Sequence, residues 1–375
     1  MYLKQRERRR SRSVWPWILS VIIAMAAAWY LYTKQTTVIE AIRGPLPTPT
    51  PTEISAREYM TKGGRLFRQG EYDEAMAAYE RATELDPSLA AAYARWGRIL
   101  ALRRQGDEAV RITQRAVEID AESAENQALL GMALDWNDQA GDAIAACLKA
   151  TKLDDTYALG YACLAEAYGD FGRVHDAHEM AQKAVELDAD DPFVRRNLGY
   201  TFELLGRYEE AIQEYEAAID LNPNHAFIYL DLGRNYRALD DMEEAARQFE
   251  KVTQADPQDP HGYDQLGWTY FAQGLYETAI SELEKAIEID PDYAPAYGHL
   301  GMAYYVRRNY EEAIPNLKKA IDLGARSEDH CYVLGFSYAY LGQCDEGIAW
   351  FEEALEINPH SSVAQEGLRY CQGKE

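Results

Sequence analysis

The sequence has 375 residues, and its 62 acidic and 38 basic side chains give a net charge of −24 at pH 7. All but three of the acids follow residue 55. Because this negative field repels phosphates, we expect no nucleic-acid partner.

The first predicted element is a transmembrane helix over residues 14–32. No charged residue occurs between Arg12 and Lys34, and aromatic residues flank both ends of the apolar run. As a helix it would extend about 28 Å, close to the roughly 30 Å hydrocarbon core of a bilayer. A homodimer through this helix is a further possibility, because small residues recur every four positions at Ser20, Ala24 and Ala28.

The charges around this helix predict its orientation. Residues 1–13 carry six basic side chains, so the positive-inside rule makes them a cytoplasmic arm of a signal anchor and places the remaining chain across the membrane. The alternative is a signal peptide cleaved near residues 26–28, which would release a secreted protein. The bulky apolar run continues through residues 29–32 beyond that site, and this favours the anchor.

Residues 33–55 are expected to form a juxtamembrane segment and linker. Residues 33–43 are ambiguous between a continued helix and a loop. Residues 44–52 alternate proline with other residues, mainly threonine, a pattern that favours an extended, semi-rigid spacer. The following Ser55-Ala-Arg-Glu58 is a capping-box pattern, which predicts the start of a helix.

Residues 56–361 repeat nine times with a period of 34 residues and no insertion or deletion. A fixed period of this length indicates a solenoid. Each unit has large apolar residues at helical spacing on both sides of a polar turn, which predicts two helices. Small residues recur in phase and predict where helix backbones approach closely. One such series is Gly63, Gly97, Gly131, Ala165, Gly199, Gly233, Gly267, Gly301 and Gly335.

These units resemble the tetratricopeptide repeat (TPR) family. The pattern W-x2-L-G-x2-Y, followed by alanine, an aromatic residue, alanine and proline, recurs at fixed phase. The resemblance implies an all-α, right-handed superhelical solenoid of nine helix hairpins, whose first helices line a concave face that holds peptide segments of partner proteins. Residues 362–375 are expected to form a polar capping helix, because Arg369 replaces the small residue of the series.

The resemblance also places a peptide-binding groove on the first helices. From the fifth unit onward, the corresponding positions change from small or mixed residues to aromatics mixed with polar side chains, which is typical of recognition surfaces. Packing between repeats or self-association is the alternative use of these side chains. The expected groove residues are Arg196, Asn197, Tyr200, Arg234, Arg237, Asp264, Gln265, Trp268, Phe271, His299, Tyr305, Tyr332 and Phe336.

The sequence contains no phosphate-binding glycine loop, nucleophile elbow or HExxH motif, so we expect no enzyme activity, metal or cofactor. Cys344 and Cys371 lie on helices expected to be antiparallel, and we hypothesise a disulfide between them; Cys147 is interpreted as a core residue. The predicted function is a non-enzymatic scaffold for protein–protein interaction, tethered to the membrane. The alternative is a structural assembly subunit of an envelope complex for secretion, export or biogenesis, with the array buried inside it.

Overall fold

The computed structural model describes residues 14–43 and 54–373, and the chain divides into two units, Met1–Ile54 and Ser55–Glu375. In the first unit, α1 spans Trp15–Arg43, so residues 33–43 continue the helix. Its segment Trp15–Lys34 is long and apolar enough to cross a membrane, and the side chains of this segment are exposed. The basic arm of residues 1–13 and the proline-rich residues 44–52 lie outside the described residues.

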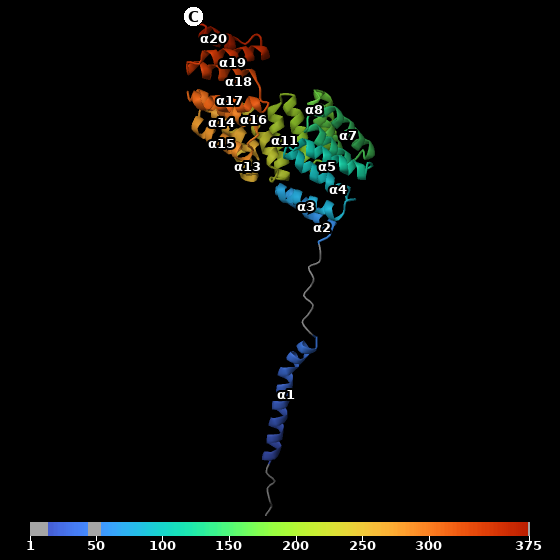
Figure 1. Ribbon diagram of the computed structural model, residues 1–375. Coiled ribbons are helices and arrows are strands. Elements are labelled where there is room, and N and C mark those ends of the chain that lie inside the picture. Colours follow the sequence, from blue (N-terminus) through green and yellow to red (C-terminus); the bar gives the residue numbers. More distant parts are fainter. Residues whose placement is uncertain (1–13, 44–53, 374–375) are drawn as a thin grey trace, which may run out of the picture. The chain divides into compact units, whose positions relative to one another are not determined.

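The second unit is all-helical over its described residues, and it confirms the nine predicted hairpins and the cap helix (Figure 1). Repeats 1–5 are α2 (Ala56–Arg68) with α3 (Tyr72–Leu85), α4 (Ala90–Leu102) with α5 (Gly106–Ile119), α6 (Ala124–Asp135) with α7 (Ala140–Leu153), α8 (Ala158–Asp170) with α9 (Val174–Leu187), and α10 (Pro192–Leu204) with α11 (Tyr208–Leu221). Repeats 6–9 and the cap are α12 (Ala226–Ala238) with α13 (Met242–Ala255), α14 (Pro260–Ala272) with α15 (Tyr276–Ile289), α16 (Ala294–Val306) with α17 (Tyr310–Asp322), α18 (Glu328–Tyr340) with α19 (Cys344–Ile357), and α20 (Ser362–Cys371).

Local signals set where the helices start and turn. The Ser55 side chain accepts from the Glu58 amide and the Glu58 carboxylate accepts from the Ser55 amide, which completes the predicted capping box at α2. One residue in the turn of every hairpin has a positive φ, as expected just after a helix end. These residues are Gly70, Arg104, Asp138, Gly172, Gly206, Asp240, Gly274, Arg308 and Gly342.

Small residues let the two helices of each hairpin approach closely. A Cβ atom added at Gly233 would lie 2.6 Å from a ring carbon of Phe249, which is fully buried at the centre of α13. In repeat 4, Ala165 replaces the glycine, and the facing position holds Ala181. The smaller facing side chain leaves room for the extra methyl group, so this departure from the pattern preserves the packing.

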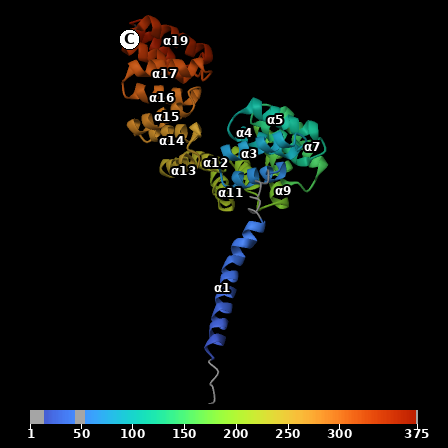
Figure 2. The same cartoon turned by 60° about the horizontal axis from the view of Figure 1, so that its bottom comes forward.

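Repeats 1–6 close on themselves, and we call α2–α13 the ring. The Tyr72 hydroxyl in repeat 1 lies 3.1 Å from His225 Nδ1 at the start of repeat 6, and Arg103 Nη1 donates to Asp256 Oδ2 at 2.6 Å. In Figure 2, α3, α4, α5, α7, α9 and α11 gather in one group, and α14, α15, α16, α17 and α19 continue beyond it as an arm. Solenoid repeats normally contact only their neighbours, whereas here repeats 1 and 2 also contact repeat 6.

The curvature that closes the ring follows from small residues on the concave face. First helices pack more closely against one another in repeats 2–5 than in later repeats. Ala94, Ala128 and Ala162 lie on α4, α6 and α8 and are 0–2% exposed, so these backbones can approach. At the same place in the repeat, α10 carries Arg196. From α10 onward, each first helix packs less closely against the next first helix.

Two disulfides join second helices to later first helices or to the cap. The bridge predicted between Cys344 and Cys371 is present, with Cα atoms 5.3 Å apart. Cys147 was expected to be a core residue only; it is buried and is also joined to Cys163, with Cα atoms 5.8 Å apart. Cys331 is a buried free thiol.

Candidate functional site

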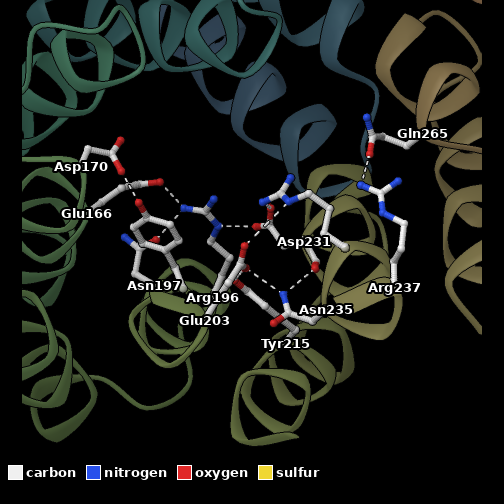
Figure 3. A network of polar contacts seen from close by, with 12 residues as sticks. Glu166, Asp170, Arg196, Asn197, Glu203, Tyr215, Asp231, Asn235, Arg237 and Gln265 are labelled. Carbon is white, nitrogen blue, oxygen red and sulfur yellow. Dashed lines mark hydrogen bonds and ion pairs between the residues drawn. The ribbon is translucent and has the colours of Figure 1, made fainter. Parts of the chain in front are cut away.

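The predicted groove residues separate into a buried polar network in the ring and an accessible surface on the arm. Arg196 and Asn197 are 7% and 4% exposed and belong to the network (Figure 3). Arg196 Nε donates to Asp231 Oδ2 at 2.6 Å, and its Nη1 is paired with Glu166. Asn197 Nδ2 donates to the Ala162 carbonyl oxygen at 2.9 Å. Both side chains therefore serve the ring's own structure.

The network continues into repeat 6. Arg234 Nη2 donates to Asp231 Oδ1 at 2.6 Å, and the Tyr200 hydroxyl donates to Asp170. Burial alone would raise the pKa of Asp231, but the guanidiniums of Arg196 and Arg234 outweigh burial and hold that pKa below its usual value. Asp231 is therefore a buried anion shared between two cations.

Side chains from repeats far apart in sequence meet at the centre of the ring, where they line a cavity of about 450 Å³. The guanidinium carbon of Arg98 lies 3.6 Å from the centroid of the Phe193 ring, which also packs against Phe67, His225 and Phe227. Burial, with the nearby charge of Arg98, lowers the pKa of His225 to about 3, so this imidazole is neutral. A peptide on the concave face of repeats 1–6 would therefore meet the side chains of Arg98, Phe193 and His225.

On the arm, six ring-bearing side chains follow one another along the first helices. We call Trp268, Phe271, His299, Tyr305, Phe336 and Tyr340 the aromatic face. The Trp268 ring stacks on Phe271 at 4.7 Å and on His299 at 4.2 Å between centroids. Tyr340, 45% exposed, stacks on Tyr305 and Phe336 at 6.4 and 5.8 Å. The other five side chains are half-buried.

The remaining predicted groove residues either support the aromatic face or lie away from it. Asp264 is fully buried and lies 2.6 Å from His299 Nδ1, so it orients that imidazole. Arg237 Nη2 donates to Gln265 Oε1 at 2.7 Å at the junction with the ring. Tyr332 packs against the core of repeat 9, and burial, with a hydrogen bond to Asp329, raises its pKa to about 12. The sequence expectation missed several acidic residues of the concave face, among them the buried Asp135, which is 4% exposed.

Three family models match the chain. A TPR repeat model matches residues 63–102 and 267–306, and two tetratricopeptide repeat models match residues 204–266 and residues 164–226 with 297–362. No curated protein matches the sequence.

Solved structures of the same fold cover most of the chain. The APC/C hetero-tetramer Cut9-Hcn1 is 16% identical, with a TM-score of 0.63 over 84% of this chain and 76% of that chain. The human IFIT1 dimer with m7Gppp-AAAA is 16% identical, with a TM-score of 0.54 over 91% and 80%. Pseudomonas aeruginosa pilF is 17% identical, with a TM-score of 0.52 over 59% and 99%. At these identities the likeness is one of fold.

Proposed function

The chain belongs to the tetratricopeptide repeat family, and from this premise we propose that it is a membrane-tethered scaffold that binds peptide segments of partner proteins on its aromatic face. The TPR solenoid is typically a non-catalytic scaffold for protein interaction. In this proposal the arm binds the peptide segments, and α1 holds the array at the membrane.

The observation that carries the proposal is the contrast between ring and arm. In the ring, most concave side chains pack against one another or form internal ion pairs. On the arm, the stack of Trp268, Phe271 and His299 keeps part of its surface accessible on consecutive first helices. Aromatic side chains gathered at an accessible concave surface contribute most of the binding free energy in many interfaces. A partner segment with apolar side chains would cover these rings.

Replacing Trp268 and Phe271 together with alanine is expected to weaken partner binding by roughly 30-fold or more, equivalent to about 2 kcal/mol. Circular dichroism should show that the array stays folded, because both rings are only half-buried. A photoreactive residue in place of Met302 on α16 would crosslink the partner, and we would compare the amount of crosslinked partner recovered from each variant. We would then measure the dissociation constant of the partner segment identified by the crosslink.

The matched control is Phe171→Ala, which removes an aromatic ring that is 59% exposed outside the aromatic face. Equal recovery with both variants would contradict the proposal. If the array is instead a buried assembly subunit, the complex that contains the double variant should dissociate during gel filtration. Weaker binding of one peptide segment would then not be the only effect.

We propose further that α1 anchors the chain with the array outside the cytoplasm. An apolar window over Trp15–Lys34 and six basic residues before it support this orientation. Two disulfides within the array support it independently, because such bonds persist in oxidising compartments and are rare in the cytosol.

Thiol counting tests this placement. In the chain released from cells directly into denaturant with a thiol-labelling reagent and no reductant, we expect one reactive thiol, Cys331. Reduction should then expose all five cysteines, which serves as the internal control. Five reactive thiols before reduction would place the array in a reducing compartment.

A further inference from the structure

A cavity of about 200 Å³ on the concave face of the ring has an excess of negative charge. It is lined by side chains from the first helices of repeats 2–6 and from the start of repeat 7. Its carboxylates are Asp135, Asp138, Glu166, Asp170, Asp231 and Asp259. Three cations also line it, namely Arg104, Arg196 and Arg234, and so does the imidazole of His261.

Most of these carboxylates already have partners. Glu166 and Asp231 pair with Arg196, and Asp170 accepts from a tyrosine hydroxyl. Asp259 caps α14 and lies 2.7 Å from His261 Nδ1. The ion pairs and hydrogen bonds at this cavity therefore satisfy four of the six.

Two carboxylates remain, Asp138, which is exposed to solvent, and Asp135, which is buried. Asp135 ends α6, it is 4% exposed, and neither carboxylate oxygen has a hydrogen-bond donor among the residues that the structure describes. Buried polar groups without partners are rare, because each costs desolvation free energy that no hydrogen bond returns. Burial, reinforced by Glu166 and Asp170 and opposed by Arg196, raises the pKa of Asp135 to about 9. In the unliganded ring the group is therefore a protonated acid at neutral pH.

Aromatic rings complete the cavity. Trp136, Tyr200 and Phe227 line it beside Asp135. Arg196 already lies over two of them, with its guanidinium carbon 5.7 Å from the Trp136 centroid and 5.5 Å from the Tyr200 centroid. Aromatic faces beside carboxylates favour organic cations. The described residues contain no cluster of three side chains placed to hold a metal ion.

We propose that this cavity binds the guanidinium of an arginine side chain from a partner peptide, with both oxygens of Asp135 accepting its N–H groups. A planar guanidinium presents paired donors that match one carboxylate, and it can stack on an aromatic ring. On binding, Asp135 releases its proton to solvent and becomes the counterion. This site lies in the ring and is independent of the aromatic face.

The test uses the full-length chain in detergent and three probes. N-acetylarginine amide carries the guanidinium on a peptide-like backbone, N-acetylcitrulline amide has the same shape without the charge, and agmatine is a free small guanidine. We expect saturable binding of the arginine probe with a dissociation constant on the order of 1 mM, and at least about 10-fold weaker binding of the citrulline probe. Titration calorimetry in two buffers at pH 7 should show about one proton released per bound arginine probe.

Asp135→Asn is the decisive variant. Asparagine resembles the protonated acid, so the ring should fold, and a thermal melt without probe checks this. Binding of the arginine probe should weaken at least about 10-fold and proton release should disappear. Asp142→Asn, which makes the same charge change at an exposed position on α7, should bind as the unaltered chain does.

Several results would overturn the site. These are no saturable binding of the arginine probe up to about 10 mM, equal binding of the citrulline probe, and unchanged binding by the Asp135 variant. Binding of agmatine without binding of N-acetylarginine amide would overturn the assignment to a peptide side chain. A fluorine-labelled tryptophan spectrum gives an independent readout in the unaltered chain, since the Trp136 signal should shift when the arginine probe binds.

Discussion

Replacing Phe193 with alanine is expected to lower the free energy of unfolding of the ring by about 3–5 kcal/mol. Phe193 is 6% exposed, and its ring stacks on Phe67 of repeat 1 at 6.1 Å and contacts Phe227 of repeat 6 at 5.0 Å. Alanine would leave a cavity at the point where repeats 1, 5 and 6 meet. The loss would therefore reach repeats that are not neighbours in sequence.

Hydrogen exchange measured by mass spectrometry would show which repeats lose stability. Peptides from repeats 1 and 2 should lose protection together with peptides from repeats 5 and 6. Phe351→Ala is the matched control, because Phe351 is fully buried in repeat 9 and its packing partners are local. Its effect should stay in repeats 8 and 9 and the cap. If repeats 1 and 2 kept their protection in the Phe193 variant, the ring would not be held closed by this residue.

Replacing Arg196 with methionine is the second large change, with an expected loss of about 3–5 kcal/mol at pH 7. The substitution keeps most of the side-chain volume but leaves Glu166 and Asp231, at 7% and 3% exposure, without their shared cation. Chemical denaturation monitored by circular dichroism measures the loss. Arg115→Met removes the Arg115–Glu118 pair, whose side chains are each 53% exposed, and should cost less than about 1 kcal/mol.

The pH dependence of this loss has a definite sign. The pKa of Asp231 in the folded chain lies below its usual value of about 3.9, so the pairing stabilises the fold above that pH and fades as the pH falls through the folded pKa. The difference between the unaltered chain and the Arg196 variant should therefore shrink below about pH 4. A difference that stayed constant down to pH 3 would show that packing, and not charge, accounts for the loss.

The candidate site was only partly predictable because residues on the concave face can serve two purposes. Arg196 and Trp268 both lie on concave faces of first helices, and the sequence predicted both as ligand contacts. Arg196 became buried because Glu166 and Asp231 approach it from the neighbouring repeats. Trp268 kept an accessible surface because no distant repeat returns to cover the arm. No pattern within one repeat distinguishes these outcomes.

The sequence by itself determined the hairpins, their number and the cap, and it suggested the Cys344–Cys371 bridge as a hypothesis, because these features depend on contacts within or between adjacent repeats. The run of Ala94, Ala128 and Ala162 was visible too, but its consequence was not. A small change in the angle between neighbouring helices accumulates over several repeats before Tyr72 can meet His225, 153 residues away. Only the tertiary structure therefore decided that the first six repeats close into a ring and leave the later ones open.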